Sequence, residues 1–171
     1  MAFGGYIPLI ALWLDTKDIS FSNIGLITGA SSVGVIISAY FGPRIVTKIG
    51  YLRGAICGIL LASVAGVAFR FFNSEIIWIG LRVIAGLGFG LHWVISEAWL
   101  GQLVSNKNRT KAMSLYVVSM ALGFSAGPAV GGLIITRIGY EGLFWTDGIT
   151  CVLAAFLLLN VLHPKKAKIQ D

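Results

Sequence analysis

Long apolar runs, separated by short polar segments, make up nearly the whole chain. Six runs can be drawn, at residues 3–14, 21–41, 54–72, 76–100, 113–135 and 143–162. A helix needs about 20 residues to cross the hydrocarbon core of a bilayer, and every run except the first is close to that length or exceeds it. None of the runs shows the period-two alternation of a membrane β-barrel. The chain is therefore expected to form a bundle of membrane helices.

The composition indicates that lipid is the solvent of this chain. Hydrophobic residues make up 57% of the sequence and charged residues only 12%, whereas an ordinary soluble domain has about 25% charged residues. The predicted fold is an all-α membrane protein, a six-transmembrane-helix bundle whose first helix is truncated. Cys57 and Cys151 lie in apolar runs without metal-ligand spacing, so neither a metal site nor a cofactor is expected.

The positive charges are concentrated in every second connection. Of the 13 lysines and arginines, nine fall in the segments 42–53, 101–112 and 163–171. These nine are Arg44, Lys48, Arg53, Lys107, Arg109, Lys111, Lys165, Lys166 and Lys168. Because cytoplasmic loops carry an excess of such residues, these three segments are predicted to be cytoplasmic. The net charge of +6 is thus explained by topology, and no nucleic-acid partner is expected.

A short sequence repeat relates the two halves of the chain. Residues 47–51 read TKIGY and residues 136–140 read TRIGY, with an offset of 89. The first copy follows the second run and the second copy follows the fifth run, so the copies are expected at opposite membrane faces. This predicts a helix bundle over 1–162 with inverted repeats at about 1–73 and 74–162, followed by a cytoplasmic linker or tail at 163–171. The same offset predicts that roughly ten residues of the first helix precede Met1.

The fourth run carries the most polar chemistry. At 100° per residue, Arg82, Gly86, Gly90, Trp93 and Glu97 fall on one face of a helix. An ionisable residue inside a membrane costs at least ~3 kcal/mol unless it faces a cavity or a partner. Two such residues on one face therefore predict a polar pathway for a substrate or for protons.

Each of these polar residues also has a structural interpretation. Arg82 could form an ion pair or extend to the outer interface, and Glu97 could pair with Arg53 or Arg44 near the cytoplasmic end. His92 lies on another face and is a further pathway candidate, although a packed, hydrogen-bonded histidine explains it equally simply. The sequence leaves both interpretations open for all three residues.

The fifth run contains a glycine stripe and an internal proline. Gly123, Gly127 and Gly131 stack on one face, so a neighbouring helix can approach closely. Pro128 cannot donate a backbone hydrogen bond and is expected to bend the helix. Residues 123–127 also fit the pattern G-x-S-x-G of a nucleophile elbow, which makes an intramembrane hydrolase that uses Ser125 and His92 a remote alternative.

Three segments together resemble the major facilitator superfamily. Residues 82–90, an arginine followed by glycines that include Gly86 and Gly90, are similar to the helix-four signature of that family. Residues 123–132, with Gly123, Gly127, Pro128, Gly131 and Gly132, match every fixed position of its helix-five antiporter motif, G-x-x-x-G-P-x-x-G-G.

The loop signature of the family is only partly present. Gly42, Lys48, Gly50 and Arg53 occupy the expected loop between helices two and three, but the usual acidic residue is missing. Within the family, the chain is most similar to poorly characterised bacterial members related to sugar and drug efflux permeases.

The resemblance implies a function as well as a fold. It implies the first half of a twelve-helix secondary transporter in the bacterial inner membrane, with a cavity lined by helices one, two, four and five. The expected activity is proton-coupled efflux of a small molecule by alternating access, which is not an enzymatic reaction. The expected partners are the lipid bilayer, the substrate, protons and a second six-helix half. The alternative is a membrane fragment or scaffold that transports nothing without a six-helix partner.

Overall fold

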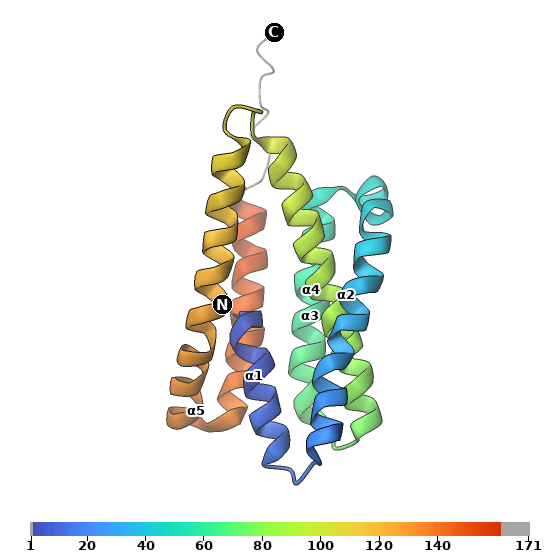
Figure 1. The fold of residues 1–171 in the computed structure, drawn as a ribbon, viewed down its shortest axis with the longest axis vertical. Coiled ribbons are helices and arrows are strands. Elements are labelled where there is room, and N and C mark those ends of the chain that lie inside the picture. The colour runs from blue at the N-terminus through green and yellow to red at the C-terminus, as the bar shows by residue number, and fades with distance from the viewer. Residues whose placement is uncertain (1, 162–171) are drawn as a thin grey trace.

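The computed structural model describes residues 2–161, and it describes side chains from residue 8 to residue 160. The elements in this range are α1 (Ala2–Asp15), α2 (Phe21–Ile49), α3 (Tyr51–Ala68), the single-turn helix η1 (Phe69–Phe71), α4 (Glu75–Leu103) and α5 (Arg109–Val161). α5 consists of two segments, because Gly139 has non-helical backbone angles and the chain reverses direction there (Figure 1). The predicted all-α membrane bundle is confirmed. The predicted tail at 163–171 lies outside the described residues.

The helices are long enough for a membrane and remain apolar on the outside. Within residues 2–161, four spans qualify by length and hydropathy: α2, α3 with η1, α4 and α5. α2 and α4 have 29 residues each, which corresponds to about 43 Å and exceeds the ~30 Å hydrocarbon core. α1, with 14 residues, does not qualify. Ile36 and Leu115 are among the many apolar side chains that are more than half exposed, as expected for a surface that faces lipid.

The helices extend further than the apolar runs. The segment expected as the loop 42–53 is helical except at Gly50, and the segment expected as the loop 101–112 is non-helical only at 104–108. Hydropathy marks the part of a helix that lies in hydrocarbon, whereas backbone hydrogen bonding continues into the interface. The helix ends are set by local signals instead. Ser20, for example, accepts a hydrogen bond from the Asn23 N–H and so caps the start of α2.

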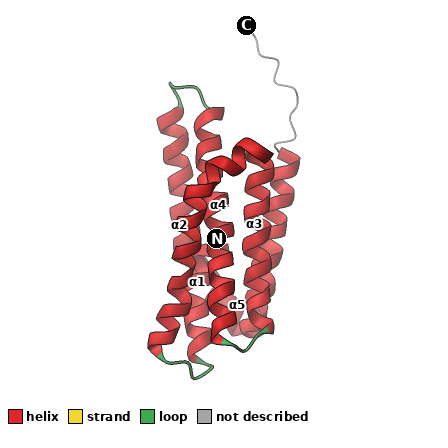
Figure 2. Ribbon diagram, turned by 90° about the vertical axis from the view of Figure 1, so that its right-hand side faces the viewer, coloured by secondary structure: helices red, strands yellow, loops and turns green. Residues whose placement is uncertain are grey.

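The connections lie at the two ends of the bundle, as Figure 2 shows. The α2–α3 and α4–α5 connections share one end, and the α1–α2 and α3–α4 connections share the other end with the turn inside α5 (Figure 1). This is the alternation that the charged loops predicted. The assignment of the first end to the cytoplasm stays a prediction.

The two copies of the sequence repeat form turns of the same shape. Gly50 has φ 81° and ψ 168°, and Gly139 has φ 74° and ψ 179°. In each copy the threonine three residues earlier donates a hydrogen bond to the carbonyl one turn back, Thr47 to Arg44 O at 2.8 Å and Thr136 to Leu133 O at 2.9 Å. The repeat therefore encodes a helix reversal at a single glycine, once at each end of the bundle. The division into repeats at about 1–73 and 74–162 stays a prediction.

α4 is the central helix of the tightest group. It packs closely against α2 on one side and α3 on the other, whereas α5 packs mainly on α1 and α3 and scarcely touches α4. The main core lies near the α1–α2 end, where Trp13, Phe69, Trp78 and Phe144 form a cluster of ring contacts at 5.3–6.4 Å. The Trp78 Nε1–H donates to the carbonyls of Phe69 and Phe72, which joins the end of α3 to the start of α4.

Candidate functional site

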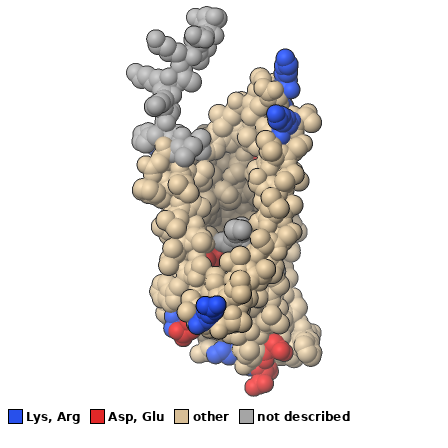
Figure 3. Space-filling view, turned by 90° about the vertical axis from the view of Figure 1, so that its left-hand side faces the viewer, with Lys and Arg blue, Asp and Glu red and all other residues tan. Residues whose placement is uncertain are grey.

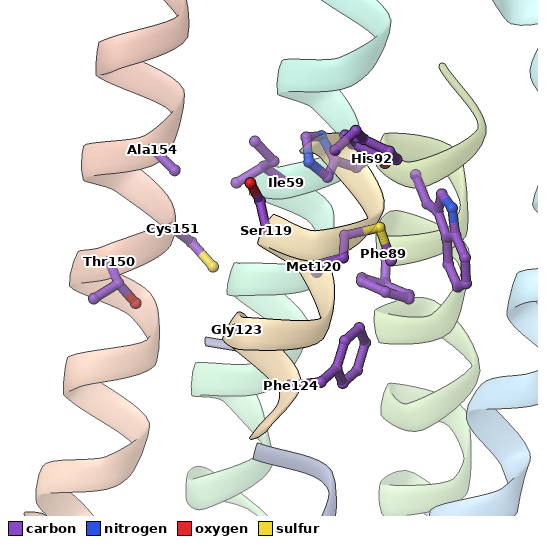
Figure 4. A pocket seen from close by; sticks show the side chains of 13 residues that line it. Ile59, Phe89, His92, Ser119, Met120, Gly123, Phe124, Thr150, Cys151 and Ala154 are labelled. Carbon is purple, nitrogen blue, oxygen red and sulfur yellow. The ribbon is translucent and has the colours of Figure 1, made fainter. Parts of the chain in front are cut away.

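A cavity of about 460 Å³ lies between α3, α4 and the two segments of α5. Figure 4 shows Phe89 and His92 of α4 on one side, Ser119 to Phe124 of α5 in the middle, and Thr150 to Ala154 of α5 on the other side. The lining residues are Ile59, Ala62, Phe89, His92, Trp93, Tyr116, Ser119, Met120, Gly123, Phe124, Thr150, Cys151 and Ala154. The cavity exists because α4 and the first segment of α5 diverge. The same side of the molecule is hollowed in the upper half of Figure 3.

Aromatic rings form part of the walls of this cavity. The Phe89 ring packs edge-on against Trp93 at 5.5 Å and against Phe124 at 6.4 Å. Tyr116 adds a fourth ring, and Met120 adds a flexible thioether. Among the described residues that line it, none is a lysine, arginine, aspartate or glutamate. The walls can therefore contact flat apolar groups, while the hydroxyls of Tyr116, Ser119 and Thr150 offer a few hydrogen bonds.

His92 lines the cavity, and its backbone packs against Gly58 of α3. A Cβ at Gly58 would lie 2.7 Å from both the His92 backbone nitrogen and the Gly88 carbonyl oxygen, so a larger residue would push α3 away from α4. The His92 Nδ1 lies 3.4 Å from the Ser96 hydroxyl. The histidine is thus both packed and exposed to the cavity, in agreement with both interpretations of it.

Arg82 does not line this cavity. Its side chain is 1% exposed and lies between α2 and α4. The Nη2 group donates to the Thr28 carbonyl at 3.3 Å and to the Ser31 hydroxyl at 3.2 Å. Arg82 therefore connects two helices in this structure, while Trp93, on the same predicted face, lies at the cavity.

Glu97 lies on the exposed surface of α4, one turn beyond Trp93. Glu97 is not among the described residues that line the cavity. Within residues 2–161 the structure shows one salt bridge, between Arg70 and Glu141 at 2.9 Å. The proposed pairing of Glu97 with Arg53 or Arg44 is thus absent from this part of the chain.

The helix-five motif contributes Gly123 to the cavity and Gly131 to a helix contact. Gly123 lines the cavity, and Gly127 and Gly131 are buried on the same face. A Cβ at Gly131 would collide with Leu9 of α1, so this glycine lets α1 and α5 approach closely. A Cβ at Gly132 would have no atom within 4 Å. The helix continues through Pro128.

The residues of the loop signature and Ser125 of the hydrolase alternative lie outside the cavity lining. Gly42 is buried against Val94 of α4, whereas Lys48 and Arg53 are exposed on either side of the Gly50 turn. Ser125 is an exposed residue of a continuous helix and not of a strand–turn–helix elbow. The strand–turn–helix elbow on which the hydrolase alternative rested is therefore not formed at Ser125.

Several cavity residues were not singled out from the sequence. They are Phe89, Tyr116, Ser119, Phe124, Thr150 and Cys151. Residues 116, 119, 120 and 123 follow helical spacing, so they share a face with Gly123. That spacing was available in the sequence, but it did not show whether the face meets lipid, a helix or a cavity.

The chain is similar to bacterial membrane transporters. It is 26% identical over 131 residues to an uncharacterized MFS-type transporter of Bacillus subtilis (strain 168), covering 77% of this chain and 34% of that protein. It is 25% identical over 134 residues to multidrug resistance protein 2 of the same organism, covering 78% and 34%. An uncharacterized MFS-type transporter of Yersinia enterocolitica is 24% identical over 155 residues, covering 91% and 40%. The matched part of the chain thus spans 34–40% of the length of these relatives.

The sequence profile of the Major Facilitator Superfamily provides the assignment. It matches residues 1–171, which include the arginine–glycine segment of α4, the glycine–proline segment of α5 and every helix described above. The membrane-spanning helices and the transporter names of the relatives agree with that match. The chain belongs to the Major Facilitator Superfamily of membrane transporters.

Proposed function

We propose that this chain forms the first six-helix half of a proton-coupled exporter of small, largely apolar aromatic molecules. The observation that carries the proposal is the uncharged, aromatic-walled cavity between α3, α4 and α5. In this proposal the cavity binds the substrate, and a second six-helix half completes the path by alternating access. The name of one relative, multidrug resistance protein 2, agrees with export.

The size and chemistry of the cavity support this substrate class. A volume of about 460 Å³ falls within the ~300–1,000 Å³ range of cavities that hold drug-sized ligands. Phe89, Trp93 and Phe124 offer ring faces and edges to a planar ligand, and a single positive charge on that ligand is tolerated over a ring face. An anionic ligand is disfavoured, because no lysine or arginine is found among the cavity-lining residues of the range 8–160.

Glu97 is the proposed proton carrier of the cavity. It lies on α4, four residues after the cavity residue Trp93, so its protonation would change the charge of the helix that forms one wall of the cavity. Gly127 and Pro128 are the proposed hinge of α5, since a proline in a closely packed helix weakens the backbone hydrogen bonding there. Arg82, by contrast, is assigned to the α2–α4 contact rather than to the substrate.

Binding is tested on the purified chain in nanodiscs with the apolar aromatic dye 1-N-phenylnaphthylamine. Replacing Ser119 by Trp fills the cavity and is expected to lower dye binding at least tenfold, a loss of about 1.4 kcal/mol. The matched control is Ser125→Trp, which adds the same ring to the same helix outside the cavity. Equal binding by both variants would show that the dye occupies lipid or another site.

Proton coupling is tested in inside-out membrane vesicles that contain the chain together with its second half. Acidification of the vesicle interior is expected to drive dye accumulation, and Glu97→Gln is expected to abolish that accumulation while dye binding persists. Accumulation that remains fully dependent on the pH gradient in Glu97→Gln would remove Glu97 from the mechanism.

A further inference from the structure

An open groove lies at the α4–α5 end of the bundle, on a different face of α5 from the aromatic cavity. It has a volume of about 730 Å³ and runs from the connection at 104–108 along the first turns of α5. Asn106, Arg109, Thr110 and Ser114 form its outer part, and Val117 and Val118 lie at its inner part. The residues recur every three to four positions, so they line one face of the helix.

The groove changes from polar to apolar along its length. Val118 lies nine residues after Arg109, which is about 13 Å along the helix axis. Val117 and Val118 are 59% and 53% exposed, so this part of the helix has no protein partner within the described residues. A cationic and hydroxyl-bearing end followed by an apolar wall fits an amphiphile with an anionic head and an acyl chain.

The outer part of the groove carries concentrated positive charge. Lys107, Arg109 and Lys111 lie within five residues of one another, and no aspartate or glutamate occurs between Glu97 and Glu141. None of these three cations forms an ion pair with any residue of the range 2–161. The Arg109 guanidinium lies over Gly101, where a Cβ would approach its Nη2 to 3.2 Å, so the small residue at the end of α4 places this side chain at the groove.

The two hydroxyls of the groove differ from others in the bundle. Ser119 and Thr136 of the same helix donate to a carbonyl of the preceding turn, at 2.7 Å to Leu115 O and at 2.9 Å to Leu133 O. Thr110 and Ser114 make no such bond within the described part of the chain, and both are exposed at the groove. Their O–H groups are therefore available to a ligand beside Arg109.

We propose that this groove binds one anionic phospholipid. The phosphate lies at Arg109 and accepts hydrogen bonds from Thr110 and Ser114, and one acyl chain lies along Val117 and Val118. Charge complementarity favours an anionic over a zwitterionic headgroup. The positive group of a zwitterionic headgroup would be repelled by Lys107, Arg109 and Lys111, which have no ion-pair partner within residues 2–161. This site is independent of the proposed transport activity, since it lies on a different face of α5 from the cavity.

Native mass spectrometry of the whole chain tests the proposal. The purified chain is titrated with phosphatidylglycerol or phosphatidylcholine of identical acyl chains. One phosphatidylglycerol is expected to be retained in preference to phosphatidylcholine, and Arg109→Ala is expected to reduce this preference about fivefold, as for one cation near a membrane surface. Arg137→Ala is the matched control, because it removes an exposed cation of α5 at the other end and is expected to leave the preference unchanged.

A second variant keeps Arg109 and its contact with α4. Thr110→Val with Ser114→Ala preserves shape and charge and is expected to lower retention of phosphatidylglycerol without changing its dependence on salt. The proposal is overturned if the two lipids are retained equally, or if Arg109→Ala and Arg137→Ala lower the preference to the same extent. Either result would mean that the basic residues attract lipid only as a general surface charge.

Discussion

Arg82 shows how one charged side chain is accommodated in the bundle. It is buried between α2 and α4, and its Nη2 group donates to the Thr28 carbonyl and the Ser31 hydroxyl. The Ser31 hydroxyl in turn donates to the same Thr28 carbonyl at 2.9 Å. The three residues form a small network in which the arginine joins α4 to a carbonyl and a hydroxyl of α2.

Replacing Arg82 by Ala is expected to lower the stability of the bundle by about 2–3 kcal/mol, because hydrogen bonds from a charged group are lost and a void is left. Arg82→Lys is expected to restore only part of this loss, since an ammonium does not have the planar fork of a guanidinium. Unfolding of the purified chain in detergent, followed by circular dichroism, measures both effects. Arg137→Ala, at an exposed position, serves as the control. Unchanged stability with lost dye binding would return Arg82 to the substrate pathway.

At the scale of the elements, the packing of α4 against its neighbours depends on its glycines. On one side a Cβ at Gly86 would collide with the Ser31 carbonyl of α2, and on the other side a Cβ at Gly88 would collide with the Ala62 backbone of α3. α2 and α3 therefore approach α4 at backbone distance. Such close contacts replace the hydrophobic effect as the source of helix association in lipid.

Gly86→Ala is expected to destabilise the bundle by about 1–3 kcal/mol through overpacking at the α2–α4 contact. Gly80→Ala on the same helix is the matched control, because no atom lies within 4 Å of the Cβ position there. The control is expected to leave stability unchanged or to raise it slightly through helix propensity. Equal behaviour of the two variants in an unfolding titration would mean that the α2–α4 contact is looser than described.

The single-glycine turns are the second feature at the scale of elements. Gly50 and Gly139 combine a positive φ with an extended ψ, a region that essentially only glycine adopts. No atom lies within 4 Å of the Cβ position of either residue, so the cost of a substitution is conformational rather than steric.

Gly50→Ala and Gly139→Ala are each expected to cost about 1–3 kcal/mol, and asparagine is not expected to rescue either turn, since it tolerates only the left-handed helical region. Thermal unfolding of the four variants provides the measurement, with Gly132→Ala, a helical position open to space, as the control. Full stability of the asparagine variants would show that the turns relax to another conformation.

At the scale of the whole molecule, the two ends of the bundle are packed differently, as expected for one conformation of an alternating-access cycle. The ring cluster of Trp13, Phe69, Trp78 and Phe144 closes the bundle near the α1–α2 end. The cavity lies beyond that cluster, towards the α4–α5 end. The described conformation is thus better packed at one end than at the other, and the cavity is expected to open towards the cytoplasm if the predicted orientation holds.

Two asparagines at opposite ends test that orientation. In a chain whose Cys57 and Cys151 are replaced by Ala, Asn106→Cys in the α4–α5 connection is expected to react with a membrane-impermeant maleimide only in inside-out vesicles. Asn73→Cys, in the α3–α4 connection, is expected to react only in intact spheroplasts. The opposite labelling pattern would reverse the predicted topology and would place the lipid groove on the other side of the membrane.

Much of this architecture follows from local properties of the sequence. The apolar runs predicted the helices, the charge pattern predicted which connections share an end, and the repeat led to the two glycine turns. The predicted glycine face of helix five is buried as expected. Each of these features depends on solvent preference or on backbone conformation within a few residues, which is why a single sequence reveals it.

The tertiary structure decided which partner each polar or small residue meets. Arg82 and Trp93 share a predicted helix face, yet one is buried against α2 and the other lines the cavity. Hydrophobic periodicity is weak when lipid and protein neighbours are equally apolar, so it cannot distinguish a helix contact from a cavity or from lipid. The sequence by itself therefore determined the helices, their order and their family, whereas the crossing of α4 between α2 and α3 and its divergence from α5 decided where the cavity lies.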